Sequence, residues 1–214
     1  MDMLHNVDSS FLGQHYEELN EIFATYLNVI NPFIVQFEIL RNEFPVELQN
    51  EIRAMYGHLS RAALAENEED VQRNIQKIKS HTKRAVLDCY KYSCIIFTDH
   101  YTDFFERYKG VDLSYLDNGT FLHEIHSLRK TASDKLRGAK RAETSNISEQ
   151  ELFDLYEDAY NCFGNLDKRL QEVEESATFL KHRATKKDHL AVLSFVIGII
   201  GTIAGIIGIA IALL

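Results

Sequence analysis

The chain of 214 residues has only two prolines, no tryptophan and three cysteines. Proline interrupts helices, so its scarcity permits long uninterrupted helical segments. Cys89, Cys94 and Cys162 are odd in number and irregularly spaced, which is untypical of a disulfide framework or a zinc site. We therefore expect an all-α protein with reduced cytosolic thiols and no cofactor.

Positive charge is also scarce. The 23 Lys and Arg residues are outnumbered by 32 Asp and Glu residues, giving a formal net charge of −9. This balance argues against a generally basic nucleic-acid-binding protein, because such proteins carry broad positive surfaces. It leaves room for a small basic pocket on an otherwise acidic body.

The longest apolar run is residues 190–214, LAVLSFVIGIIGTIAGIIGIAIALL, which contains no charged residue, Pro or His. At about 1.5 Å per residue, such a helix can cross a hydrocarbon core of roughly 30 Å. We expect a single membrane-spanning helix, because a soluble chain of this size rarely buries so long a helix that is apolar all round.

The residues before this run set the expected orientation. Basic side chains gather just before it, and none follows it; they are Lys181, His182, Arg183, Lys186, Lys187 and His189. Positive charge stays on the cytoplasmic side of a membrane. We therefore expect an inner-membrane protein with a cytoplasmic N-terminal body and lipid around the span.

The rest of the chain divides into predicted helices. Apolar residues at helical spacing predict a first helix over 8–30, ended by Asn31-Pro32, and a short second helix ended by Phe44-Pro45. Further helices are expected over 45–66, from about 70 to 109 with Gly110 as the residue that ends it, and over about 120–142. Ser148 and Glu151 form a capping-box pattern that begins a last helix.

This last helix has the clearest repeat. Two columns of residues seven apart form a heptad seam, namely Leu152, Ala159, Leu166, Val173, Leu180 and Tyr156, Phe163, Leu170, Ala177, Ala184. The commoner meaning of such a seam is a core stripe within one chain. The alternative is a helix, continuous from about Ser148 to the end of the sequence, that packs on copies of itself.

The same columns continue into the apolar run with small residues only, namely Ser194, Gly198, Gly201, Gly205, Gly208 and Ala212. In lipid, small residues let helix backbones approach closely. We expect a homo-oligomer, with a tetramer among the assemblies it allows. The stripe fits either a pore that opens by helix rearrangement or a plain anchor that only dimerises.

Two copies of His-x-x-Arg-Ala flank the acidic stretch 66–70, with His58 and Arg61 on one side and His81 and Arg84 on the other. In an antiparallel hairpin the two histidines fall at the same level. Arg53 is then expected near Arg84, and Lys77 near Arg61. Such a cluster suits a phosphate-bearing ligand, a nucleotide or a single-stranded oligonucleotide, with Tyr56, Tyr90 and Tyr92 nearby to stack a base. Two solvated helix faces are the plainer alternative.

Two weaker patterns remain. Arg53 to His58 resembles the Arg-x4-His motif of HEPN ribonucleases, which are helical dimers, and the resemblance would make both residues catalytic. His123-x-x-His126 could place two imidazoles on one helix face, but a metal site needs more ligands. We expect no metal and no enzyme activity, with the membrane-tethered HEPN-like ribonuclease as an alternative.

A helical body, a mirrored basic pair and a Gly-rich span together resemble bacterial anti-phage membrane effectors, most of all the channel effector of the Hailong type. The resemblance implies that a nucleotidyltransferase partner makes a deoxyadenylate oligomer that holds the oligomeric effector shut. It also implies that the basic pair binds this oligomer and that the tail forms the channel.

These observations give three expected parts: a cytosolic ligand-binding body over 1–147, a heptad connector helix over 148–189 and the membrane helix over 190–214. The expected function is a ligand-gated pore or ion channel in antiviral defence. A tail-anchored scaffold that binds only protein is the remaining alternative.

Overall fold

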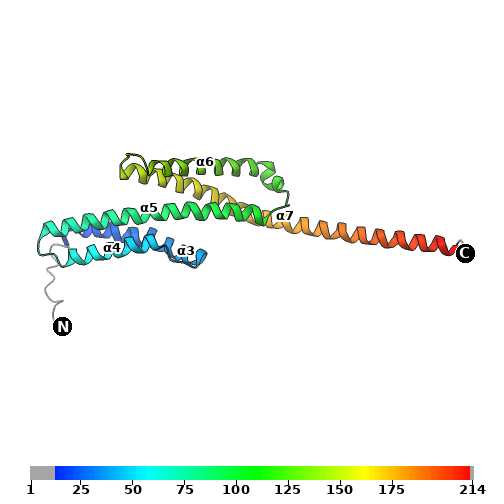
Figure 1. Cartoon of the computed structure of the whole chain (residues 1–214), viewed down its shortest axis with the longest axis horizontal. Coiled ribbons are helices and arrows are strands. Elements are labelled where there is room, and N and C mark those ends of the chain that lie inside the picture. Colours follow the sequence, from blue (N-terminus) through cyan, green and yellow to red (C-terminus); the bar gives the residue numbers. More distant parts are fainter. Residues whose placement is uncertain (1–12, 213–214) are drawn as a thin grey trace, which may run out of the picture. The chain divides into compact units, whose positions relative to one another are not determined.

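The computed structural model describes the backbone of residues 13–212, and the side chains of these residues except 187–193 and 198–212. The described residues form helices and turns and no strand, so the expected all-α class is confirmed. The elements are α2 (Tyr16–Thr25), η1 (Tyr26–Ile30), α3 (Asn31–Arg41), α4 (Val46–Ala63), α5 (Glu68–Arg107), η2 (Leu113–Gly119), α6 (Phe121–Ala142) and α7 (Glu149–Ala212) (Figure 1).

The predicted break at Asn31-Pro32 is wrong. The chain passes from α2 into α3 through η1, a turn of π-helix, with Pro32 in the first turn of α3. The Asn31 amide donates to the carbonyl of Tyr26, five residues earlier. Proline lacks an amide hydrogen and crowds the preceding turn. The wider π turn accommodates it, so the helical path continues.

Two predicted helix boundaries are confirmed. Gly110 follows α5 with φ +81°, a conformation that glycine adopts without strain. The Glu151 amide donates to Ser148 Oγ at 3.2 Å, and the Ser148 amide donates to Glu151 Oε2 at 2.9 Å. This reciprocal pair is the capping box expected at the start of α7. The short second helix ends earlier than the expected Phe44-Pro45: α3 stops at Arg41, and Asn42 follows it in the left-handed conformation at φ 53°.

The chain divides into two compact units. Unit 1 holds the described residues up to Ile96 together with Asp134–Asn161, and unit 2 holds Phe97–Ser133 together with the chain from Cys162 onward. Helices α5, α6 and α7 each contribute to both units. The segment 148–189, expected as a connector, is therefore divided between the two packed units.

Unit 1 has two apolar clusters. One joins α3, α4 and α5 around Ile30, Leu48 and Ala85, all fully buried. The other joins α2, α4 and α5 around Val71 and Ile75. These clusters fix α4 against the first part of α5, where the mirrored basic pair lies.

The heptad seam of α7 is buried within the chain. In unit 2, Phe163 and Leu166 are fully buried, with Leu170, Val173 and Ala177 at most 4% exposed. In unit 1, Tyr156 and Ala159 are at most 1% exposed. The seam from Tyr156 to Ala177 is therefore the intramolecular core stripe, and these side chains are not available to a second copy of the chain.

Among the described residues, one helical segment, Tyr16–Arg41, is long and apolar enough to cross a membrane, with a mean hydropathy of 1.3. Ile30 and Phe33 of this segment lie in the core of unit 1, which is the behaviour of a packed helix. Its exposed side mixes apolar residues, such as Tyr16 (70% exposed) and Ile39 (78% exposed), with the charged residues Glu17, Glu21 and Glu38. The expected span over 190–214 has a helical backbone to Ala212, but most of its side chains lie outside the described residues.

Candidate functional site

Helices α4 and α5 run antiparallel in unit 1 and bring the two histidines of the mirrored motifs together (Figure 1). The imidazole rings of His58 and His81 are stacked, with centroids 5.3 Å apart and planes 27° from parallel. The expectation that the two residues lie at the same level is therefore confirmed. Both side chains are partly buried, and the buried Ala62 and Ala85 hold the two helices together one turn further along.

The hydrogen bonds of the two histidines follow a local two-fold pattern. His58 Nδ1 lies 2.9 Å from Asn74 Oδ1 on α5, and His81 Nδ1 lies 2.6 Å from Glu51 Oε2 on α4. Each partner precedes the histidine of its own helix by the same interval, since 58 − 51 equals 81 − 74. Each helix therefore supplies both a histidine and the residue that fixes the histidine of the other helix.

The same offset relates further positions of the two helices. Adding 23 to an α4 residue number gives its α5 counterpart, as 81 − 58 shows. The buried counterparts are Leu48 and Val71, Met55 and Ile78, and Ala62 and Ala85. The sequence comparison found the two His-x-x-Arg-Ala segments but missed Glu51 and Asn74. The 23-residue offset was the pattern that could have found them.

The hydrogen-bond network sets the state of the rings. The Asn74 side-chain amide donates to the backbone carbonyl of Asp70 at 2.8 Å, so the Asn74 oxygen faces His58 and accepts from it. Glu51 can only accept when ionised. Both histidines therefore carry their hydrogen on Nδ1, and each Nε2 makes no hydrogen bond within the described part of the chain. Each Nε2 is left to accept a hydrogen bond from a ligand, or to donate one when the ring is protonated.

The two arginines flank the imidazole stack. Arg61 Nη2 lies 3.0 Å from His58 Nδ1, and Arg84 Nη2 lies 3.3 Å from His81 Nδ1. Because each Nδ1 already donates its hydrogen to another residue, it is a poor hydrogen-bond acceptor for the neighbouring guanidinium group. Each arginine lies three residues beyond its histidine, and the helices run in opposite directions. The arginines are thus offset by roughly 9 Å along the helix axes, at about 1.5 Å per residue.

The two arginines differ in their surroundings. Arg84 Nε lies 3.7 Å from Glu51 Oε2, with its side chain 49% exposed. The position equivalent to Glu51 on α5 is the neutral Asn74, so Arg61 has no carboxylate at that place. Arg61 is therefore the less compensated of the two cations, and a phosphate group is its natural complement.

Arg53 and Lys77 are both exposed. Neither forms a hydrogen bond or an ion pair with the part of the chain that the structure describes. Their expected proximity to Arg84 and Arg61 stays a prediction. Arg53 also precedes His58 by five residues, which is about 140° around a helix. The His58 ring faces α5, so the helix geometry gives the two residues of the HEPN-like motif different directions.

The structure corrects the expectation for two of the three tyrosines. Tyr90 stacks on Tyr160 with centroids 4.8 Å apart, and its hydroxyl donates to Glu157. Tyr92 packs against Phe37 and donates to a carboxylate of α4. Burial raises the pKa of both Tyr90 and Tyr92 to about 12. These two rings are structural. Tyr56 on α4 is 71% exposed, but it precedes His58 by two residues and therefore lies about 160° around the helix from the stacked rings.

Three described histidines outside this cluster contact other side chains, namely His15, His100 and His126. His126 stacks on Phe105 and lies 3.1 Å from the hydroxyl of Tyr101. Within the described residues, no group of three or more His, Cys, Asp or Glu side chains is placed to hold a metal ion. His123 is exposed. The His123-x-x-His126 pattern gains no further ligand among these residues.

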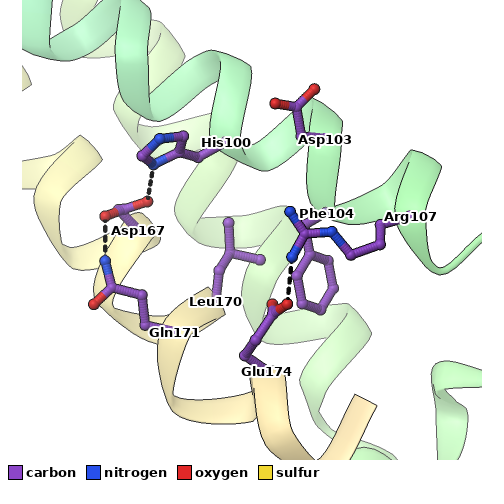
Figure 2. A pocket seen from close by; sticks show the side chains of 8 residues that line it. All are labelled: His100, Asp103, Phe104, Arg107, Asp167, Leu170, Gln171 and Glu174. Atoms are coloured by element: carbon purple, nitrogen blue, oxygen red, sulfur yellow. Dashed lines mark hydrogen bonds and ion pairs between the residues drawn. The ribbon is translucent and has the colours of Figure 1, made fainter. Parts of the chain in front are cut away.

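A cavity lies in unit 2, between parts of α5 and α7, with a volume of about 410 Å³ (Figure 2). His100 Nδ1 lies 3.0 Å from Asp167, and Gln171 donates to the same carboxylate at 2.7 Å. Arg107 and Glu174 form an ion pair at 2.5 Å. These polar groups are paired with one another across the cavity, so they tie the two helices together.

Comparisons with known proteins leave the chain without a family. No protein-family model matches it, and no curated protein or solved structure is significantly similar to it. The case for a function therefore depends on the geometry of the α4–α5 site and on the sequence of α7.

Proposed function

We propose that the protein is a membrane-anchored oligomeric effector whose helical body binds a phosphate-bearing ligand, a nucleotide or a single-stranded oligonucleotide. Binding at the α4–α5 site changes how the body packs, and α7 carries that change to an apolar helix that forms a pore in the membrane. A nucleotidyltransferase partner is a natural source of such a ligand.

The observation that carries this proposal is the continuity of α7. One helix extends from Glu149 to Ala212, so the buried seam and the apolar run share one backbone. Residues Ser194 to Ile197 are all exposed, and four successive helical residues point in directions that cover most of the circumference. Phe195 is 70% and Ile197 61% exposed. An apolar segment exposed in these directions is stabilised by lipid or by copies of itself.

The small-residue stripe supports assembly in the membrane rather than in the body. The seam residues from Tyr156 to Ala177 are buried in their own chain, whereas Ser194, Gly198, Gly201, Gly205 and Gly208 continue the seam into the apolar run. Close backbone contact at such a stripe drives helix association in lipid. Oligomerisation through the tail leaves the core of each body intact.

The α4–α5 site concentrates basic side chains on a small part of an acidic protein. The stacked imidazoles, Arg61 and Arg84 combine ring nitrogens with positive charge, a combination that suits a phosphate group. Arg53 and Lys77 add exposed positive charge on the same two helices. A ligand shifts a conformational equilibrium only through a difference in affinity for the two states. A site between two helices provides that difference when their spacing changes.

The ligand site is tested with Arg61→Glu combined with Arg84→Glu in the full chain in detergent. We expect binding of a fluorescein-labelled single-stranded DNA 10-mer to fall by about 100-fold or more, because two phosphate contacts become repulsive. Fluorescence anisotropy at fixed salt measures the change.

The control for this test is Lys109→Glu combined with Arg137→Glu, which alters the net charge equally at side chains that are exposed elsewhere. It should change binding by less than about threefold. Equal losses in the two double variants would show that net charge, and not this site, governs binding.

A further inference from the structure

We propose that the α4–α5 site consists of two half-sites related by the local two-fold, and that Glu51 acts in one of them as a built-in competitor of the ligand's phosphate. This inference rests on the proposed phosphate-binding function of the same site. One half-site contains His58, Asn74 and Arg61, and the other contains His81, Glu51 and Arg84.

Glu51 occupies the position of an anionic ligand. Its Oε2 atom lies 2.6 Å from His81 Nδ1 and 3.7 Å from Arg84 Nε, so one carboxylate oxygen faces both the imidazole N–H and the guanidinium group of its half-site. A phosphate oxygen seeks the same donors with the same sign of charge. A ligand phosphate at Arg84 must therefore displace Glu51 or bind beside a like charge.

Asn74 plays the same structural part without the charge. It accepts from His58 at 2.9 Å and is 8% exposed. Its amide oxygen orients the ring as Glu51 does in the other half-site, yet it leaves Arg61 uncompensated at that position. The Arg61 half-site is open to an anion, and the Arg84 half-site is already neutralised from within.

This asymmetry specifies the class of ligand. A single phosphate gains only the Arg61 half-site, because the second half-site holds its own anion. A ligand with two phosphates spaced to reach both arginines, roughly 9 Å apart along the helices, can use the first contact to bring the second phosphate against Glu51. The site therefore selects phosphodiester chains over inorganic phosphate or a mononucleotide.

The test compares Glu51→Gln, Asn74→Asp and the wild-type full chain in detergent, with the labelled single-stranded DNA 10-mer as the probe. Glu51→Gln keeps an oxygen acceptor for His81 and removes the competing charge, so affinity should rise about tenfold at low salt. Asn74→Asp places a carboxylate in the open half-site, so affinity should fall by about the same factor.

The matched control is Glu17→Gln, which removes one negative charge from an exposed position on α2. It should alter affinity by less than about twofold, because exposed charges at a distance are screened. Thermal unfolding of each variant verifies that the fold is retained. The salt dependence gives a second readout: the slope of log K against log salt should steepen by about 0.7 in Glu51→Gln, one additional phosphate contact on a single strand.

Two outcomes would overturn the inference, and they are distinguishable. If Glu51→Gln behaves like Glu17→Gln while Arg61→Glu with Arg84→Glu still abolishes binding, the site stands and the competition by Glu51 does not. If neither the wild-type chain nor any of these variants binds the DNA, the proposed phosphate site itself is wrong.

Discussion

At the scale of single residues, the body depends on histidines that meet carboxylates from other helices. His15, which is 6% exposed, lies 2.8 Å from Glu18 and 2.7 Å from Glu68. The hydrogen bond with Glu18, followed by that with Glu68, raises the pKa of His15 against the opposing effect of burial. Its partner Glu18 has a lowered pKa, chiefly because of Lys79 and then His15. The protonated histidine and the ionised carboxylates therefore stabilise the fold together.

The pKa directions predict how stability depends on pH. A raised histidine pKa contributes stability that is fully present below about pH 6.5 and is lost as the pH rises through the folded-state pKa. A lowered glutamate pKa contributes above about pH 4.5. His15→Ala should therefore lower the free energy of unfolding most between about pH 5 and 6.5, by about 1 kcal/mol more than at pH 8.5.

Urea unfolding of the full chain in detergent at both pH values measures this difference. Glu17→Gln is the control, because Glu17 is exposed on the same helix. An equal loss for His15→Ala at pH 5.5 and pH 8.5 would contradict the ion-pair account and leave only the packing of the ring.

Sequence analysis found the His and Arg residues of the candidate site but not what holds them. The mirrored spacing predicted that His58 and His81 lie at the same level of the two helices, and the stacked rings confirm this prediction. Glu51 and Asn74 were missed because each belongs to the opposite helix from the ring it fixes, and a motif on one helix does not include them. Tyr90 was misassigned because nearness in sequence does not fix which face of a helix a ring occupies.

At the scale of elements, a helix boundary could be predicted from the sequence where it depends only on neighbouring residues. The capping box of Ser148 and Glu151 and the terminating Gly110 both lie where expected, because each needs only neighbouring residues. The break expected at Pro32 did not form. The π turn η1 accommodates a proline that has no amide hydrogen, and burial of Ile30 and Phe33 holds the helix in place. The continuation of the helix through Pro32 depends on packing between helices, which a rule based on one helix does not include.

The seam of α7 likewise separates what a local repeat predicts from what depends on tertiary packing. The heptad repeat correctly identified the buried face, with Phe163 and Leu166 fully buried. A repeat alone does not say whether the partner is the same chain or a copy. In the body the partner is the same chain, so the predicted self-association is confined to the small-residue continuation beyond Ser194.

This continuation gives a prediction at the scale of one helix. Cells that express the wild-type chain and cells that express Arg61→Glu with Arg84→Glu represent the ligand-bound and ligand-free states, and we expect one of them to be depolarised. Adding Gly201→Leu with Gly205→Leu to that background should abolish the depolarisation, because bulky side chains prevent close helix contact. A membrane-potential dye reports the result.

Ile200→Leu with Ile206→Leu is the matched control, since it retains bulk on faces outside the stripe. It should leave the depolarisation unchanged. Persistent depolarisation in the double glycine variant would show that the stripe is not the interface of the pore.

At the scale of the whole molecule, the acidic composition and the local basic site are compatible because they act over different distances. A net charge of −9 repels a polyanion at long range, but solution ions screen that repulsion beyond about 8–10 Å. Arg61 and Arg84 act at contact distance, where screening is weak. The fold class followed from composition and periodicity, whereas the division into two units, with three helices shared, depends on packing that no local pattern encodes.

The central claim is that the chain assembles through its tail and binds a phosphate-bearing ligand in its body. The most direct test is native mass spectrometry of the full chain purified in detergent, with phosphorus analysis of any bound small molecule. The account predicts an oligomer that carries a phosphate-containing ligand, loses the ligand in Arg61→Glu with Arg84→Glu, and falls to monomers in Gly201→Leu with Gly205→Leu. A wild-type monomer without a phosphorus-containing ligand would contradict it.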